Sequence, residues 1–271
     1  MREELISVIC TVKNGGKTLT QTIMSVINQD FTNWEFVIVD DGSNDETKSI
    51  LTKFGEQDRR IKPVYTNGVG RGKALNLAIQ KSSGKFIANI DADDLMHPKR
   101  LQLQLNQFIE NEDIFLVCSD SVIFYNNETP VWEEQRRDKL EYITDNLLIK
   151  NRISHSSVMI RKQDLINIGC YNDTLKSQFD YELWLRALAY QKVMVKVPIK
   201  LVAKRIHEGQ SFENKKRFRY LLRSQKLQVK YALLIRKRVF AVLMITPFRI
   251  VLGFLPFQLR KHISFYIHKV L

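Results

Sequence analysis

Two clusters of acidic residues in the first half of the chain have the composition of a site for a divalent metal ion. Residues 39–43 read VDDGS and residues 91–94 read DADD. Carboxylates that meet at one place repel each other unless a cation lies among them, and their oxygens suit Mg²⁺ or Mn²⁺. One such cluster alone is explained more simply as a turn, in which Ser43 or Asp45 could cap the next helix. The two clusters together favour a cation held with a diphosphate.

A glycine-rich loop, NGVGRGKALN at residues 67–76, adds groups that could bind an anion. The cations Arg71 and Lys73 lie where a helix is predicted to begin, and a helix N-terminus with nearby cations attracts phosphate. The loop is not a Walker A motif, because Asn67 stands where that motif needs glycine and Ala74 where it needs Ser or Thr. Contact of Arg71 with a pyrophosphate and simple turn formation both stay open.

Alternating strand and helix signals must position these groups. Short runs rich in β-branched and aromatic residues predict strands, and stretches with apolar residues at helical spacing predict helices between them. Such alternation predicts an α/β fold with a largely parallel sheet and helices on both faces, which binds ligands beyond the carboxyl ends of its strands. The predicted strands are 6–12, 34–40, 61–66, 85–91 and 114–125, and the predicted helices are 18–29, 45–54, 71–81 and 98–111.

The composition predicts a globular protein made and kept in the cytosol. The chain has 271 residues, of which 44% are hydrophobic, enough for a full core. Its beginning, MREELISVICTV, lacks the basic start and long apolar stretch of a secretory signal. Cys10, Cys118 and Cys170 fit neither a disulfide framework nor a zinc site, and we expect them to be buried.

The positive charge is confined to the end of the chain. Residues 213–271 hold 14 Lys or Arg and one acidic residue, a balance of +13 that equals the net charge of the whole chain. Basic residues beside apolar and aromatic ones favour helices that lie on an anionic lipid surface. A basic helix packed on the protein and a nucleic-acid-binding segment are the alternatives. The stretch 239–259 is interrupted by two prolines, so a clean transmembrane helix is not expected.

The order of these motifs resembles the family 2 inverting glycosyltransferases with the GT-A fold, of the bacterial surface-polysaccharide type. The resemblance spans about residues 5–210 and includes FDYELWLR and RIHEGQS downstream of the two acidic clusters. It implies that Thr11, Val12 and Lys13 contact the nucleotide of a sugar donor together with Asp41. Asp91 and Ala92 of the DADD cluster are likewise expected to bind the donor.

The resemblance also assigns chemistry to these positions. Asp93 is the expected ligand of Mn²⁺ or Mg²⁺ and Asp91 lies nearer the ribose; the metal offsets the charge that develops on the departing diphosphate. Asp94 either completes the cluster or caps a turn. Asp180 matches the family's general base, which accepts the proton of the attacking hydroxyl. Phe179 replaces the acidic residue that often precedes this base, and helix capping is the alternative role of Asp180.

Three further residues have roles suggested mainly by the resemblance. His207 of RIHEGQS is expected near the metal or the diphosphate. His155 of ISHSSVMIR either borders the acceptor or satisfies a local hydrogen bond. Trp184 either stacks on a sugar of the acceptor or belongs to the core, because it lies within a helical pattern.

The sequence thus predicts a metal-dependent hexosyltransferase. It would move a hexose or N-acetylhexosamine from a nucleotide sugar, with UDP the expected carrier, to a glycan or lipid-linked acceptor in cell-surface polysaccharide or lipooligosaccharide synthesis. A polyprenyl-phosphate sugar synthase and a decayed sugar-nucleotide-binding protein are the alternatives. The expected parts are a donor half at 1–125, an acceptor half with the base at 126–212, and a tail at 213–271 on the inner face of the cell membrane, with no nucleic acid as partner.

Overall fold

The computed structural model describes residues 4–125, 128–132, 139–206 and 217–244. The chain divides into two compact units: Met1–Thr144 with Arg152–Glu208, and Asp145–Asn151 with Gly209–Leu271. The described residues of the candidate site all lie in the first unit. The separation of a donor half from an acceptor half near residue 125 stays a prediction.

The described elements up to Tyr125 alternate as the sequence predicts, and the rest of the first unit adds several short elements together with the long strand β9 and the helix α6. The strands are β1 (Ile6–Val12), β2 (Trp34–Asp41), β3 (Ile61–Thr66), β4 (Phe86–Asn89), β5 (Leu95–Met96), β6 (Ile114–Tyr125), β7 (Glu141–Tyr142), β8 (Met159–Arg161) and β9 (Val193–Ile206). The helices are α1 (Leu19–Ile27), α2 (Thr47–Gln57), α3 (Arg71–Lys81), α4 (Arg100–Glu110), the 3₁₀ helix η2 (His155–Ser157), α5 (Lys162–Asn167) and α6 (Phe179–Ala189).

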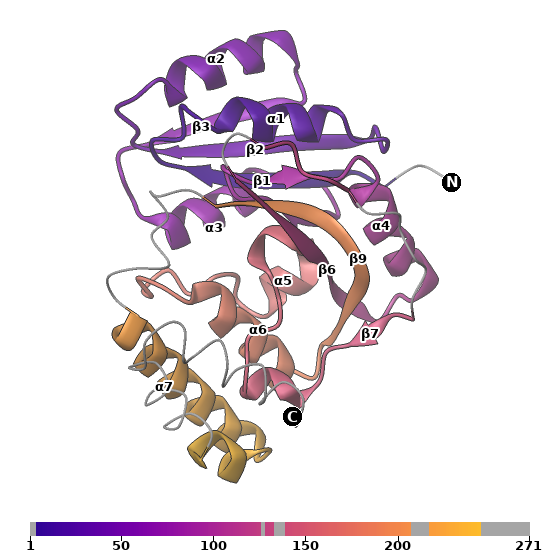
Figure 1. The fold of residues 1–271 in the computed structure, drawn as a ribbon, viewed down its shortest axis with the longest axis vertical. Helices are drawn as coiled ribbons and strands as arrows, with labels where there is room; N and C mark the ends of the chain where they lie inside the picture. The colour runs from indigo at the N-terminus through magenta and orange to yellow at the C-terminus, as the bar shows by residue number, and fades with distance from the viewer. Residues whose placement is uncertain (1–3, 126–127, 133–138, 207–216, 245–271) are drawn as a thin grey trace. The chain divides into compact units, whose positions relative to one another are not determined.

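The first half of the sheet is parallel. Its strands lie in the order β3, β2, β1, β4, and each neighbouring pair is parallel. The chain crosses the sheet from β1 to β3 and then returns to β4 on the other side of β1. Right-handed crossovers therefore place α1 and α2 on one face and α3 on the other, as Figure 1 shows. The predicted α/β sheet with helices on both faces is confirmed.

The second half of the sheet mixes strand directions. β8 is antiparallel to both β4 and β6, and β6 pairs in parallel with the long strand β9. β5 is antiparallel to β9, with Leu95 opposite Ala203. Residues 90–94 therefore form a turn between β4, near the centre of the sheet, and β5, at its edge. This turn contains the DADD cluster.

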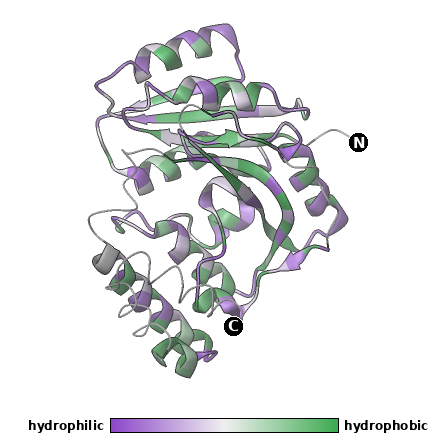
Figure 2. Cartoon of the chain, viewed as in Figure 1, coloured by the Kyte–Doolittle hydropathy of each residue, from purple (hydrophilic) through white to green (hydrophobic). Residues whose placement is uncertain are grey.

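The core fills the space between the sheet and its helices. Every residue of β2 is buried, as expected for a central strand covered on both faces. Figure 2 shows the strands as the most hydrophobic part of the first unit. Cys10 and Cys118 are buried free thiols, as predicted, whereas the free thiol of Cys170 is only half-buried.

The second unit contains the 3₁₀ helix η1 (Asp145–Leu148) and the basic helix α7 (Arg217–Ile235). Gln228 of α7 donates from Nε2 to the carbonyl of Ile149 over 2.9 Å, and Arg238 lies 3.2 Å from the carboxylate of Asp145. Among the described residues, no helix combines the length and the hydropathy needed to cross a membrane. The predicted tail is thus helical where it is described, and residues 245–271 lie outside the described part.

Candidate active site

The loops that follow β1 and β2 are bonded to each other. The amide of Asn14 donates to Ser43 Oγ over 2.8 Å, and the amide of Gly16 donates to Asp45 Oδ2 over 2.9 Å. Asp45 also accepts the amide of Thr47 at the start of α2 over 3.0 Å, whereas the N-cap residue of this helix is Glu46. The shape of the β1–α1 loop therefore depends on Ser43, the last residue of the VDDGS cluster, and on Asp45 just after it.

Asp41 organises the loop between β3 and α3. Its Oδ1 accepts the hydroxyl of Thr66 and the amide of Val69, both over 2.7 Å, and its Oδ2 accepts the amide of Gly70 over 3.0 Å. The side chain is buried, with 7% of the residue exposed. Asp41 thus shapes the rim of the strand ends, and its predicted contact with the donor stays a prediction.

Glycines allow the loops after β2 and β3 to approach closely. Gly42 has φ of +76°, and a Cβ added there would lie 2.9 Å from the amide nitrogen of Gly68. Gly70 has φ of +93° but an added Cβ would meet nothing within 4 Å. Gly42 is therefore required by both conformation and space, and Gly70 by conformation alone.

The residues predicted to contact the nucleotide lie at the same edge of the sheet. Thr11 is half-buried, Val12 is buried and Lys13 is exposed at the end of β1. The carbonyl of Ala92 accepts the hydroxyl of Thr18 over 3.0 Å, which connects the DADD turn to the start of α1. The parallel strand order thus brings the predicted donor residues to one edge, although no described contact tests their binding roles.

Asp91 forms an ion pair with Arg71. The guanidinium comes from the first residue of α3 and the carboxylate from the turn after β4. Burial alone would raise the pKa of Asp91, but the charge of Arg71 and then a hydrogen bond with His155 outweigh it, so the pKa lies well below its usual range. The structure therefore brings together two predicted donor residues separated by 20 positions.

Asp93 and Asp94 are held by Arg205 of β9. Arg205 Nε donates to the carbonyl of Asp93 over 2.9 Å, and the Arg205 amide donates to Asp94 Oδ1 over 3.1 Å. Asp94 is buried, and this burial, followed by the charges of Asp91 and Asp93, raises its pKa to about 7. The carboxylates of the turn thus interact with three arginines, Arg71, Arg100 and Arg205.

The carboxylate oxygens of this turn are the feature that fits a divalent cation. Hard oxygen donors are the ligands that Mg²⁺ and Mn²⁺ prefer, and Asp93 with Asp91 would supply them. Within the described residues, however, no three His, Cys, Asp or Glu side chains are grouped as a metal site. Asp41 bonds to Thr66 and to the loop between β3 and α3 instead of joining the turn. The metal site therefore stays a prediction.

Asp180 lies in the first turn of α6 and is half-buried. Asp91 contributes most to raising the pKa of Arg71, and Asp180 raises it further against the opposing effect of burial. The ring of the neighbouring Phe179 also faces Arg71, with 5.7 Å from its centroid to Cζ. The N-cap residue of α6 is Gln178, so Asp180 does not cap this helix. The predicted base and the predicted donor residues thus act on the same guanidinium.

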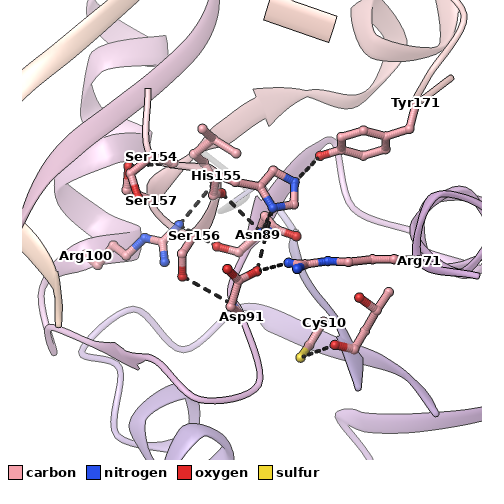
Figure 3. Close-up of polar contacts among 12 residues, drawn as sticks. Cys10, Arg71, Asn89, Asp91, Arg100, Ser154, His155, Ser156, Ser157 and Tyr171 are labelled. Carbon is pink, nitrogen blue, oxygen red and sulfur yellow. Dashed lines mark hydrogen bonds and ion pairs between the residues drawn. The ribbon is translucent and has the colours of Figure 1, made fainter. Parts of the chain in front are cut away.

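His155 is buried beside Asp91 (Figure 3). Its Nδ1 lies 3.1 Å from Asn89 Nδ2 and 3.6 Å from Asp91 Oδ1, and its Nε2 lies 2.9 Å from the hydroxyl of Tyr171. Of the two predicted alternatives for His155, contact with the acceptor and a local hydrogen bond, these distances fit the local hydrogen bond. Sequence analysis did not single out Asn89 or Tyr171, because an Asn inside a strand and a Tyr before a turn carry no signal of their own.

Arg100 was likewise not among the predicted site residues. It is fully buried, and its Nη2 donates to the carbonyls of Asn89 and Val158 over 2.9 Å and 3.1 Å. Burial lowers the pKa of Arg100 to about 9. The available signal in the sequence was an arginine on the apolar face of α4. Arg100 Nε donates to Oε1 of Gln104, four residues later, over 3.0 Å.

The remaining candidates divide into buried and undescribed residues. Trp184 is fully buried and its ring centroid lies 6.3 Å from that of His155. A core role describes Trp184, since a buried ring offers no face to a sugar. His207, the second predicted metal ligand, lies outside the described residues.

Sequence comparisons give the same family as the motifs. The family model of Glycosyl transferase family 2 matches residues 7–167, more than half of the chain. An uncharacterized glycosyltransferase of Rickettsia typhi is 27% identical over 76% of this chain, and the chain spans 65% of that relative's length. The Escherichia coli enzyme WfgD, a UDP-Glc:α-D-GlcNAc-diphosphoundecaprenol β-1,3-glucosyltransferase, is 32% identical over 69% of this chain and 71% of its own length.

Solved structures share the fold. S. aureus TarS 1–349 in complex with UDP superposes with a TM-score of 0.64 at 21% identity, over 84% of this chain and 65% of that chain. The same protein in complex with UDP-GlcNAc gives a TM-score of 0.66 at 19% identity, over 85% of this chain and 70% of that chain. The predicted GT-A fold is confirmed. Together with the family match, it shows that the chain belongs to glycosyl transferase family 2.

Proposed function

We propose that the protein is an inverting glycosyltransferase that moves a hexose or N-acetylhexosamine from a UDP-sugar to a glycan or lipid-linked acceptor of the cell surface. The observation that carries this proposal is that Arg71 pairs with Asp91 after β4 and lies 5.7 Å from the ring of Phe179, the residue before Asp180 on α6. A donor group and a general base must flank one sugar-sized space for a single displacement.

In this proposal, the donor-binding residues and the base have separate tasks. Arg71 binds the diphosphate, Asp91 holds Arg71 and the ribose side of the donor, and Asp180 accepts the proton of the attacking hydroxyl. A divalent cation, held by Asp93 with Asp91, would supply charge compensation for the departing diphosphate. His207, the second predicted ligand, would bind the same cation.

Relatives support the chemical class of donor and acceptor. WfgD is described as using UDP-Glc and a diphosphoundecaprenol-linked sugar, and TarS has been crystallised with UDP and with UDP-GlcNAc. We therefore place the UDP-sugar and the lipid-linked glycan ahead of a polyprenyl-phosphate acceptor. Because the chain matches only part of several relatives, the complete reaction stays a proposal.

The second unit supports action at the inner face of the membrane. Arg236 and Lys237 are exposed next to the described end of α7. Large apolar side chains are exposed around them, namely Leu233, Leu234, Phe240, Leu243 and Met244. Exposed basic and apolar side chains in one segment match the chemistry of an anionic lipid surface.

The proposal is tested by measuring thermal unfolding with a panel of UDP-, GDP- and dTDP-sugars, each with Mn²⁺, Mg²⁺ or chelator. A ligand at about 100 times its dissociation constant stabilises the folded state by about 2.7 kcal/mol, so one sugar nucleotide should raise the melting temperature clearly. Asp93→Asn should remove the part of this effect that depends on metal. If none of these nucleotides stabilised the protein, the donor role would be contradicted. If the stabilisation were the same with metal as with chelator, and the same in Asp93→Asn as in the wild type, the metal role would be contradicted.

A further inference from the structure

Six residues from separate parts of the first unit form a closed set of contacts around the Arg71–Asp91 ion pair. We call this set the His155 network, and Figure 3 shows most of it. Its members are Arg71, Asn76, Asn89, Asp91, His155 and Tyr171.

His155 is the member that joins the strand end to the acceptor-side segment. Both of its ring nitrogens face polar partners, Nδ1 toward Asn89 and Asp91 and Nε2 toward Tyr171. Its ring contacts those of Tyr171 and Phe179 nearly at right angles, and 9% of the residue is exposed. An imidazole held in this way cannot turn without breaking hydrogen bonds in a buried site, which is costly.

Tyr171 is fixed to the helix that carries Arg71. Its amide donates to Asn76 Oδ1 over 3.0 Å, and its carbonyl accepts Asn76 Nδ2 over 2.9 Å. Helix α3 therefore reaches Asp91 by two routes, directly through Arg71 and indirectly through Tyr171 and His155. A displacement of Asp91 relative to α3 would disturb both routes.

The backbone around His155 holds the same strand end. Asn89 Nδ2 donates to the carbonyl of His155 over 3.1 Å, and the amide of Asp91 donates to Ser156 Oγ over 3.1 Å. Burial, and then the charge of Asp180, raise the pKa of Tyr171 far above its usual range. The group that His155 Nε2 contacts is therefore a neutral tyrosine hydroxyl. The contacts of His155 thus lead to Asp91 and Arg71.

We propose that His155 is a positioning residue for the donor: it fixes Asp91, and through Asp91 it fixes Arg71, in the arrangement that binds the nucleoside diphosphate. This inference rests on the proposed function, in which Arg71 and Asp91 are donor-binding residues. It replaces the alternative in which His155 contacts the acceptor, because both polar atoms of its ring are already engaged inside the protein.

The inference is tested with His155→Gln and Tyr171→Phe, with UDP and Mn²⁺ as the binding probe. Loss of an outer partner of a binding carboxylate typically weakens binding or activity by about 10- to 100-fold. We expect His155→Gln to weaken UDP binding, measured by calorimetry, by at least about tenfold, and Tyr171→Phe to weaken it severalfold. His155→Asn places an amide near the Nδ1 position and should restore part of the affinity. Tyr190→Phe is the control, since Tyr190 is 62% exposed at the end of α6.

Steady-state kinetics separate positioning from a merely structural role. The KM for the UDP-sugar should rise in both variants while the KM for the acceptor changes less than about twofold, and the circular dichroism spectrum should not change. Tyr171→Phe decides the question if His155→Gln does not fold. Folded variants that bind UDP as the wild type does, or that raise only the acceptor KM, overturn the inference alone. A wild-type protein that binds no nucleoside diphosphate overturns the proposed function as well.

Discussion

Arg71 lies within the influence of carboxylates from two distant parts of the chain. Asp91 pairs with it directly, and Asp180 raises its pKa from the first turn of α6. A guanidinium remains charged throughout the physiological pH range, so this cation is a permanent feature of the site. We expect a diphosphate that reaches Arg71 to bring the attached sugar toward Asp180.

Asp180→Asn should remove the base and leave donor binding intact. The amide has nearly the shape of the carboxylate but cannot accept the proton of the acceptor hydroxyl, and general base catalysis contributes about 10²- to 10⁴-fold. We expect kcat to fall about 100-fold or more, while the dissociation constant of UDP measured by calorimetry changes little. Near wild-type turnover in this variant would assign the base to another residue.

Asp94 should make stability depend on pH. Its folded pKa of about 7 exceeds that of an unfolded aspartate, so the folded state keeps a proton that the unfolded state loses. The free energy of unfolding should therefore fall as pH rises from about 4 to about 7, by about 1.4 kcal/mol per unit of pKa difference, and change no further from this group above that range.

Asp94→Asn tests this expectation, because the amide stays neutral and its oxygen can still accept the amide of Arg205. Urea unfolding with chelator should show the variant gaining stability over the wild type between pH 5 and pH 8. An equal pH dependence in the two proteins would mean that Asp94 does not titrate in this window.

At the scale of the elements, the predicted strands and helices of the first 125 residues are confirmed within a few residues. Long runs with period 2 or 3.6 gave enough signal for β1, β2, β3, β6 and the helices between them. β5, β7 and β8 are two or three residues long, too short to show a period. Their antiparallel pairing depends on partners far along the chain, which no local pattern reports.

The contacts of the site also divide into those that the order of the elements predicts and those that depend on distant strand pairing. Parallel strands bring their carboxyl ends to one edge, so the meeting of Arg71 and Asp91 could be expected from the order of elements. The contacts of His155 with Asn89 and Tyr171 could not, because they depend on how β8 pairs with β4. The bonds of Asp41 to the loop between β3 and α3 were not predicted either. In a sequence, a carboxylate at the end of a strand looks the same whether it binds a ligand or backbone amides.

The close approach of the loops after β2 and β3 should make Gly42 harder to replace than Gly70. Both have positive φ, but only at Gly42 would an added Cβ collide with backbone. Gly70→Ala should cost about 1 kcal/mol of unfolding free energy for its conformation, and Gly42→Ala at least about 1 kcal/mol more. Chemical denaturation of the two variants gives the comparison. Equal losses would show that the loops separate easily.

At the scale of the whole molecule, charge is divided along the chain. Residues 1–212 hold 28 basic and 28 acidic side chains, and the remainder supplies the entire excess of +13. This distribution of charge is the one expected under the proposed function, in which the acceptor lies in an anionic membrane.

Arg236→Gln combined with Lys237→Gln should weaken binding to anionic vesicles. Each basic residue near such a surface contributes about 1 kcal/mol, so we expect a loss of at least tenfold in sedimentation with phosphatidylglycerol vesicles. Lys53→Gln with Lys81→Gln is the matched control, since both lysines are exposed in the first unit. Unchanged sedimentation of the first pair, or equal loss in the control, would contradict the membrane role of the tail.

The bonds between the β1–α1 and β2–α2 loops have a practical consequence for engineering donor preference. Asn14 and Gly16 depend on Ser43 and Asp45 for the placement of their amides. A chimera that imports one of these loops from another transferase would leave the other without its partners. Both segments should be exchanged together, so the transplantable module is the pair of loops.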